Sequence, residues 1–311
     1  MNIRQILDKV EDFNNIRNYW FVRTAYGKYF DSFFEGNYVG IGWGYVTLKE
    51  FKNIAESDIK TKIIKHENIN IADSRQKGKV TSIYNKIERF INLKKGDIII
   101  VPSRKSERLA FGEILDDDPY EEYEDSKDEK FVKRRRVKWI DNKSIYELDP
   151  IFFQLKINQH TISDIGRYAP YIDKVIGNLF KKGDNTHFIL NIEKREDINF
   201  RELSSLMENV EDLLSAINKT FGFEENEDEF FVKMNLQSPG KMEIIRNGKS
   251  LAVLAYLLFL TSCGKDSKEI KDPTLREFQE QNAKKVGKTV VQLDSMEINY
   301  QEMHQPFENG K

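Results

Sequence analysis

Residues 93–117, LKKGDIIIVPSRKSERLAFGEILDD, contain two strand-forming runs with a short polar segment between them. The runs DIIIVPS and RLAFGEIL have the β-branched and aromatic content typical of strands. Upstream, the spacing of apolar residues predicts an amphipathic helix over 80–93, which the Lys-Lys-Gly-Asp turn ends. The apolar face of that helix consists of Ile83, Ile87, Phe90 and Ile91. The stretch therefore predicts a helix that leads into a sheet.

Further strand candidates and one more helix surround this stretch in the first half of the chain. The strands are YWFVR, NYVGIGW and VKRRRVKWI, which begin at residues 19, 37 and 132, and the helix is KYFDSFFEG over 28–36. Apolar alternation and β-branched runs dominate here, with helices in the connections. The first half predicts a mixed, strand-rich domain, and the fold class expected for the whole chain is α+β.

Two charged segments follow one another in this half. The acidic stretch 116–130 is expected to be a solvated hairpin loop between two strands. The basic run KRRRVK over 133–138 lies inside a strand candidate, so alternate side chains face opposite sides of the sheet. Only half of these cations could therefore point toward one ligand.

The second half of the chain has helical segments followed by a β-α-β-β-α pattern. Helical patterns cover 144–148 and 159–180, and KKGDN at 181–185 marks a boundary. A strand, a long helix, two strands joined by a Ser-Pro-Gly turn at 238–240, and an apolar helix then follow, with a last helix near 274–286. The expected domains are an N-terminal helix (1–15), a strand-rich domain (16–145), a helical linker (146–183) and an α/β domain (184–311).

The apolar run LAVLAYLLFLTSC over 251–263 is shorter than the roughly 20 residues that a membrane-spanning helix needs. We expect a buried helix that packs on the sheet of the C-terminal domain, with Leu254, Leu257 and Leu258 facing the strands. A membrane partner is therefore not expected, although a membrane-acting effector that inserts this helix after activation stays open as an alternative.

The overall composition limits the kinds of ligand. The chain has 49 basic and 51 acidic side chains and a formal net charge of −2, so nucleic acid could be held only by a local basic surface. The single cysteine, Cys263, excludes an intramolecular disulfide, and the four histidines show no metal-ligand spacing. The N-terminus lacks a secretory signal pattern. These features predict a cytoplasmic protein without a metal or another cofactor.

Residues 19–44 contain ten aromatic side chains, which either only pack or also bind a flat ligand. A pocket that reads a base needs aromatic faces, polar groups and cations for the flanking phosphates. Trp20 and Trp43 could supply faces, and Gly42 allows close approach of the backbone to a ligand. Basic residues beside the predicted strand ends are Arg23, Arg104, Lys105 and Arg108. The alternative is that the aromatic side chains are core residues of a small barrel.

The order of YWFVR, GIGWG, the stretch 93–117 and RRRVKWI resembles the PUA-like superfamily, which includes the EVE and YTH domains. It is most similar to the N-terminal modules of Mrr-type and other modification-dependent restriction proteins, over about residues 18–141. The resemblance implies a small β-barrel that accepts a modified base in an aromatic-lined pocket. Trp20, Trp43 and the segment from Ser103 to Arg108 would line that pocket.

A shorter resemblance concerns the C-terminal half, where FVKMNLQSPGKMEII and the apolar helix look like modules of bacterial anti-phage effectors. The two resemblances together imply a prokaryotic anti-phage defence protein. Its N-terminal domain would bind nucleic acid, in particular DNA that carries a modified base. Its C-terminal domain would transmit or execute the response. RNA or a free nucleotide as the ligand, a pure protein–protein adaptor with no affinity for nucleic acid, and assembly into a homo-oligomer stay open.

An enzyme is not the expected function. The nearest match to a nuclease metal motif is Gln154-Leu155-Lys156, which has no partner aspartate on a clear strand upstream. Neither a P-loop nor a Gly-x-Ser-x-Gly elbow occurs in the sequence. A metal-dependent nuclease of modified DNA is nevertheless kept as an alternative function.

Overall fold

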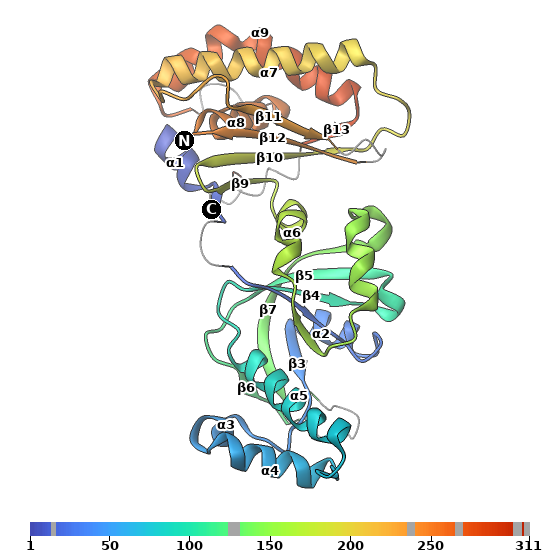
Figure 1. Cartoon of the computed structure of the whole chain (residues 1–311). Coiled ribbons are helices and arrows are strands. Elements are labelled where there is room, and N and C mark those ends of the chain that lie inside the picture. Colours follow the sequence, from blue (N-terminus) through green and yellow to red (C-terminus); the bar gives the residue numbers. More distant parts are fainter. Residues whose placement is uncertain (14–16, 124–130, 235–239, 265–269, 301–306, 308–311) are drawn as a thin grey trace. The chain divides into compact units, whose positions relative to one another are not determined.

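The computed structural model of the chain describes residues 1–13, 17–123, 131–234, 240–264, 270–300 and 307. The chain forms two compact units. Unit 1 comprises Met1–Ile16 and Gly177–Lys311, and unit 2 comprises Arg17–Ile176. Helices and strands occur in both units, which confirms the α+β class (Figure 1).

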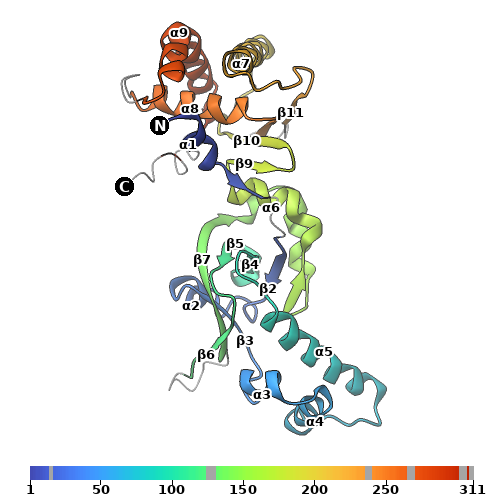
Figure 2. The ribbon, with the colours of Figure 1, turned by 90° about the vertical axis from the view of Figure 1, so that its left-hand side faces the viewer.

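Unit 2 is built on a curled, seven-stranded sheet with the strand order β3-β7-β5-β4-β2-β8, to which β6 is added beside β7 (Figure 2). β2 and β4 are parallel, and the other pairs are antiparallel. The strands are β2 Tyr19–Val22, β3 Tyr38–Ile41, β4 Ile98–Pro102, β5 Arg108–Ile114, β6 Tyr120–Glu121, β7 Lys133–Ser144 and β8 Ile162–Asp164. The strands expected in the first half of the chain are thus confirmed.

Helices fill the connections of unit 2. They are α2 Phe30–Glu35, α3 Leu48–Asn53, α4 Glu56–His66, α5 Ser74–Ile91 and α6 Ala169–Ile176, with 3-10 turns η1 Arg104–Ser106, η2 Ile145–Glu147, η3 Pro150–Ile157 and η4 Gly166–Tyr168. The α5 helix buries Ile83, Ile87 and Phe90, as their spacing predicts. It starts earlier than expected because Asp73 caps it by accepting a hydrogen bond from the backbone N–H of Arg75 (2.9 Å).

The sequence pattern did not indicate α3 and α4. α4 buries only Ile59 and Ile63, and α3 buries no residue, so neither helix has a broad apolar face. α3 begins instead with a capping box, in which Glu50 N donates to Thr47 Oγ1 (3.1 Å) and Thr47 N donates to Glu50 Oε2 (2.8 Å). Local capping rather than burial therefore defines this helix.

Unit 1 contains a second sheet with the strand order β1-β9-β10-β12-β11, and β13 pairs with β10. The strands are β1 Glu11–Asp12, β9 Leu179–Lys182, β10 Asn185–Ile192, β11 Phe230–Met234, β12 Gly240–Asn247 and β13 Ile298–Asn299. The helices are α1 Ile3–Asp8, α7 Phe200–Phe221, α8 Ser250–Ser262 and α9 Pro273–Ser295. The order β10-α7-β11-β12-α8 confirms the expected β-α-β-β-α pattern, and α9 is longer than expected.

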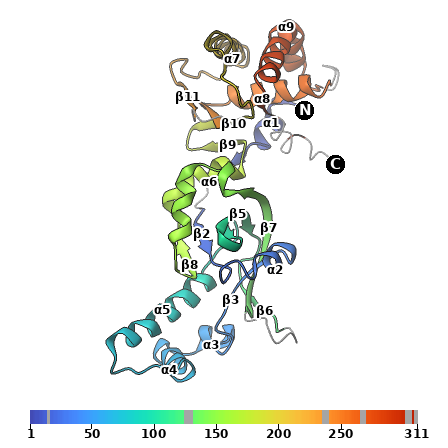
Figure 3. The ribbon, with the colours of Figure 1, turned by 90° about the vertical axis from the view of Figure 1, so that its right-hand side faces the viewer.

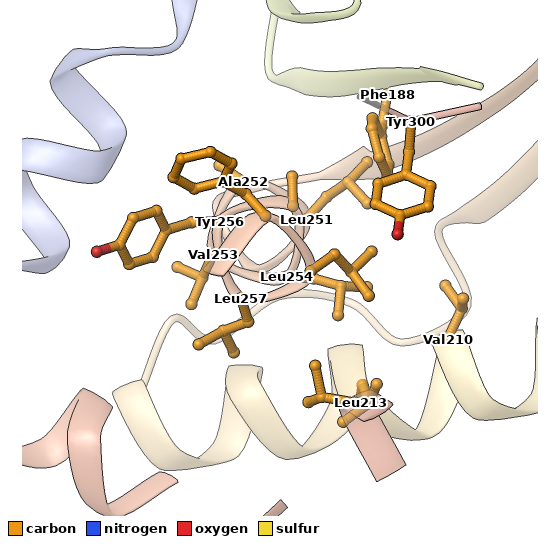
Figure 4. Packing of buried hydrophobic residues seen from close by; sticks show 14 of the residues in the cluster. Phe188, Val210, Leu213, Leu251, Ala252, Val253, Leu254, Tyr256, Leu257 and Tyr300 are labelled. Carbon is orange, nitrogen blue, oxygen red and sulfur yellow. The ribbon is translucent and has the colours of Figure 1, made fainter. Parts of the chain in front are cut away.

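The apolar helix α8 is covered on all sides. Every residue from 250 to 260 is buried, and α8 lies between the sheet on one side and α7 and α9 on the other (Figure 3). Figure 4 shows Leu257 directed toward the helix that carries Leu213, with Phe188 of β10 on the opposite side of α8. The expectation that Leu257 faces the strands is therefore wrong, because a helix that is apolar all round is buried on every face and needs no single sheet-facing side.

The boundaries between the two units differ from the domain boundaries expected from the sequence. The expected linker 146–183 is not a separate segment, since β8 pairs with β2 in unit 2 and β9 pairs with β10 in unit 1. The described part of 1–15 belongs to unit 1, where α1 contacts α8 and β1 pairs with β9. The sequence of a short strand does not show which sheet accepts it, so the local pattern could not give these divisions.

Across the described residues, no helix has both the length and the apolar composition that a membrane crossing requires. Two expected loops lie partly outside the described residues. These parts are 124–130 of the acidic loop and 238–239 of the Ser-Pro-Gly turn.

Candidate functional site

A pocket of about 270 Å³ opens at the edge of the unit 2 sheet where β2 and β4 end. Because these two strands are parallel, their carboxyl ends lie at the same edge, and the loops that follow them meet there. Gly27 of the first loop lies against the second loop, since a Cβ atom on Gly27 would be 2.2 Å from the Cα atom of Arg104. Gly27 also has a φ angle of 88°, so both space and backbone conformation favour glycine here.

Both loops hold residues in the left-handed region of the backbone. Ala25 and Tyr26 have φ angles of 49° and 61°, and Lys105 and Ser106 have φ angles of 57° and 54°. Such conformations cost about 1–3 kcal/mol each and persist where the surrounding structure fixes them. The fixing hydrogen bonds run from Thr24 Oγ1 to Pro102 O (2.6 Å), from Ser103 N to Arg108 O (2.9 Å) and from Arg108 N to Ser103 Oγ (2.8 Å).

Four cations line the pocket, and its described lining includes no carboxylate. Arg23 and Lys156 are half-buried, whereas Arg104 and Lys105 are exposed. Because these charges come from both loops and from η3, the pocket favours an anion such as phosphate. The other lining residues are Tyr26, Gly27, Pro102, Ser103 and Ser106.

One aromatic ring accompanies these cations. Tyr26 is 88% exposed, and Arg23 Cζ lies 5.9 Å from the centre of its ring. An exposed ring beside cations is the arrangement on which a base stacks while its phosphate is neutralised. The volume is slightly below the roughly 300 Å³ at which sites for drug-sized ligands begin. The pocket therefore suits one small unit, such as a single nucleotide.

The structure brings together four of the eight candidate residues from the sequence: Arg23, Ser103, Arg104 and Lys105 all line the pocket. Sequence reasoning missed Tyr26 and Lys156. Tyr26 lay within the aromatic stretch 19–44, and Lys156 belongs to the Gln154-Leu155-Lys156 motif. That motif lies on η3 and not on a strand, and Gln154 accepts a hydrogen bond from the hydroxyl of Tyr168 (3.1 Å).

Trp20 does not line this pocket. Its indole Nε1 donates a hydrogen bond to Asp97 Oδ2 (3.0 Å), and Asp97 is only 1% exposed. The same carboxylate also accepts from Asn18 Nδ2 (2.9 Å) and from the backbone N–H of Lys94 (3.0 Å). The polar edge of Trp20 therefore holds the turn before β4 and is occupied within unit 2.

Gly42 and Trp43 also lie outside the pocket lining, and both are half-buried. Trp43 packs against the core of unit 2, and Lys86 Nζ lies 5.9 Å from the centre of its ring. The φ angle of Trp43 is 62°, and its carbonyl accepts a hydrogen bond from Lys133 Nζ (2.8 Å). Trp43 thus joins the chain segment after β3 to the start of β7.

Arg108 is exposed but is not part of the pocket lining either. Its guanidinium donates to Asn142 through Nε to Oδ1 (3.1 Å) and through Nη2 to the backbone carbonyl (2.6 Å). These bonds hold the side chain along the neighbouring strand β7.

The first three cations of the basic run of β7 are used inside unit 2, whereas Arg136 and Lys138 are exposed. Lys133, Arg134 and Arg135 follow one another along the strand and are all buried, so none of the three is available to a ligand. Besides the bond from Lys133 to Trp43, Arg134 Nη1 pairs with Glu122 (2.8 Å) and Arg135 Nη1 donates to Asp116 O (2.9 Å). Burial lowers the pKa of Lys133 to about 8 and also lowers the pKa of Arg135. These three cations are hydrogen-bonded within unit 2 and do not line the pocket.

Residues 21–166 match the model of a family described as a domain of unknown function, DUF8426. This match covers nearly all of unit 2, including both loops of the pocket, the 3-10 turn η3 and every strand of its sheet at least in part. No curated protein and no solved structure matches the chain.

Proposed function

We propose that unit 2 is a PUA-like module that binds nucleic acid, with one nucleotide in the pocket at the ends of β2 and β4. The observation that carries this proposal is the convergence of Arg23, Arg104, Lys105 and Lys156 around a space of about 270 Å³ with no carboxylate in its described lining. Arginine and lysine bind phosphate through charge-assisted hydrogen bonds, which are stronger than bonds between neutral groups. The exposed ring of Tyr26 supplies the stacking face for the base.

We further propose that the bound base is a modified one in DNA and that the protein acts in anti-phage defence, with unit 1 passing on or executing the response. The support for this part is the resemblance of residues 18–141 to the modules of modification-dependent restriction proteins. A single cysteine in 311 residues suits a reducing compartment, so we place this function in the cytoplasm.

The proposal is tested by a binding screen with the full-length protein. Fluorescence anisotropy compares labelled DNA oligonucleotides that carry unmodified, methylated, hydroxymethylated or glucosylated bases. The pocket variant is Arg104→Ala, and the matched control is Lys77→Ala, which removes one exposed cation on α5 outside the pocket.

Binding of at least one oligonucleotide that weakens in Arg104→Ala and not in Lys77→Ala supports the proposal. Equal weakening in both variants would show that only general charge attraction acts. An absence of binding to the whole panel would overturn the nucleic-acid function, and equal binding of all four oligonucleotides would overturn the reading of a modified base.

A further inference from the structure

Two exposed aromatic rings form what we call the ring ledge, which consists of Tyr146 on η2 and Phe153 on η3. Tyr146 is 74% exposed and Phe153 is 38% exposed, and their ring centres are 5.7 Å apart in an edge-to-face arrangement. Lys156 Nζ lies 5.6 Å from the centre of the Tyr146 ring and 5.0 Å from that of Phe153. The ring ledge is therefore a pair of rings that shares one cation.

The ring ledge is tied to the pocket in two ways. Lys156, which contacts both rings, is itself a lining residue of the pocket. In addition, the backbone N–H of Ile145 donates to the carbonyl of Glu107 (2.9 Å), which directly follows the pocket loop 102–106. The pairing of Arg108 with Ser144 continues this contact into the sheet. The ledge and the pocket thus belong to one connected surface of unit 2.

The exposure of these rings is not explained by the fold. Burial of a large apolar side chain stabilises a protein by about 1.5–3 kcal/mol, yet neither ring belongs to the core of unit 2. The neighbouring Ile157 is 79% exposed as well. Exposed apolar side chains that gather beside polar or charged groups mark binding surfaces. A ring pair with a shared cation offers stacking for a flat group and charge for an anion attached to it.

We propose that the ring ledge stacks the base next to the one in the pocket, so that the ligand is a single-stranded segment of nucleic acid. This inference rests on the proposed function of the pocket. Lys156 contacts both rings and lines the pocket, so its ammonium group is placed to bind the phosphate that joins the two nucleotides. Bases in a duplex are already stacked on both faces, so only unpaired bases can reach an exposed ring. The alternative occupant of such a ledge, a protein partner, is an outcome of the test.

The experiment measures the affinity of the full-length protein for three probes. The probes are a nucleoside monophosphate, a single-stranded DNA of about 12 nucleotides, within the range of site sizes for single-strand binders, and the duplex of the same sequence. The variants are Tyr146→Ala, which removes a ring, and Tyr146→Phe, which keeps it. The control Phe200→Ala removes an 80% exposed ring from α7 in unit 1.

We expect tighter binding of the single strand than of the duplex. Tyr146→Ala should weaken single-strand binding by roughly 5-fold to 150-fold, the effect of losing one stacked base, and should leave monophosphate binding unchanged. Tyr146→Phe and Phe200→Ala should bind the single strand like the unaltered protein. All variants should keep the melting temperature, because the altered rings are exposed.

Two results would overturn the ring ledge and leave the pocket intact: equal affinity for duplex and single strand, or a Tyr146→Ala variant that binds the single strand normally while Arg104→Ala does not. Loss of monophosphate binding in Tyr146→Ala would assign the ring to the pocket itself and also overturn the second subsite. With all three probes made from the base that binds best in the oligonucleotide panel, absence of binding to all of them would instead overturn the proposed function and the ring ledge together.

Discussion

The carboxylate of Glu225 caps the buried helix α8 at Ser250. Glu225 Oε1 accepts a hydrogen bond from the backbone N–H of Ser250 (2.8 Å), and Oε2 accepts one from the Ser250 hydroxyl. Arg246 Nε lies 3.4 Å from Oε2, and the side chains of Glu225 and Arg246 are only 3% and 1% exposed. Because a helix N-terminus has unpaired N–H groups and a partial positive charge, this carboxylate stabilises the start of α8.

Glu225→Ala should lower the free energy of unfolding of unit 1 by about 3–5 kcal/mol, the cost of leaving one charge of a buried pair without its partner. Urea denaturation followed by circular dichroism measures this change. The control Asp228→Ala removes an exposed carboxylate from the same loop and should change stability by less than about 0.5 kcal/mol. Similar losses in the two variants would contradict the capping role.

The buried Lys133 should make stability depend on pH. Burial lowers its pKa from 10.5 to about 8 in the folded chain, whereas the unfolded chain keeps the ordinary value. Between pH 8 and pH 10.5 the unfolded state therefore binds more protons, so the free energy of unfolding rises with pH. Below pH 8 Lys133 is protonated in both the folded and the unfolded state, so its contribution to the free energy of unfolding no longer changes with pH. Between pH 8 and pH 10.5 the free energy of unfolding therefore rises by about 3 kcal/mol, at about 1.36 kcal/mol per pKa unit.

Lys133→Met isolates this contribution, since all other titrating groups are shared by the two proteins. The difference in unfolding free energy between the unaltered protein and Lys133→Met should move in favour of the unaltered protein as the pH rises from 8 to 10.5. Chemical denaturation at several pH values provides the measurement. A difference that stays constant with pH would show that Lys133 has an ordinary pKa in the folded chain.

Gly27 and Gly96 allow a matched test of how the pocket is built. Their φ angles are 88° and 86°, so alanine is strained at both positions by about 1–2 kcal/mol. At Gly27 the added Cβ atom would also lie 2.2 Å from the Arg104 Cα atom, whereas at Gly96 no atom of the described residues lies within 4 Å of it. Gly27→Ala should therefore abolish nucleotide binding, and Gly96→Ala should lose stability alone. Equal nucleotide affinity in the two folded variants would show that the contact between the loops does not shape the pocket.

Trp20→Phe tests whether this tryptophan is structural. The change removes the Nε1 hydrogen bond to the buried carboxylate of Asp97, and bonds to charged groups contribute about 1.5–3 kcal/mol. We expect a loss of stability in that range with unchanged nucleic-acid affinity. Trp139→Phe is the matched control, because Trp139 Nε1 donates to the neutral carbonyl of Phe33 (3.2 Å). This variant should lose less stability than Trp20→Phe. If Trp20→Phe kept its stability but lost nucleic-acid affinity, Trp20 would instead be a binding residue.

Much of the fold follows from local sequence patterns. The strands β4 and β5 have clear β-branched and aromatic runs and the helix α5 has clear apolar periodicity, and all three are confirmed. The parallel pairing of β2 with β4 could not be predicted, because it joins segments about 80 residues apart with no local signal. Nor could α4, whose two buried isoleucines leave most of the helix polar. Patterns of burial predict elements, and long-range pairing needs the structure.

The candidate site was predicted in part for a similar reason. Arg23, Ser103, Arg104 and Lys105 stand at the ends of predicted strands, and adjacent strand ends bring them together. Lys156 reaches the same pocket from a 3-10 turn that has no strand pattern. The polar partner of Trp20, Asp97, lies far away in the sequence, so composition alone could not show that this ring edge is already bonded.

The salt dependence of binding distinguishes cations that contact phosphate from those that do not. Each phosphate contact made by a single strand contributes about 0.7 to the slope of log affinity against log salt concentration. Arg104→Ala and Lys105→Ala should each reduce the slope by about that amount, because both cations line the pocket. Arg108→Ala should leave the slope unchanged, since its guanidinium is bonded to Asn142 outside the lining. Titrations of a single-stranded DNA at several salt concentrations supply the slopes. Equal reductions in all three variants would mean that the phosphate path runs along β5 as well as through the pocket, and a reduction in Arg108→Ala alone would place that path outside the pocket.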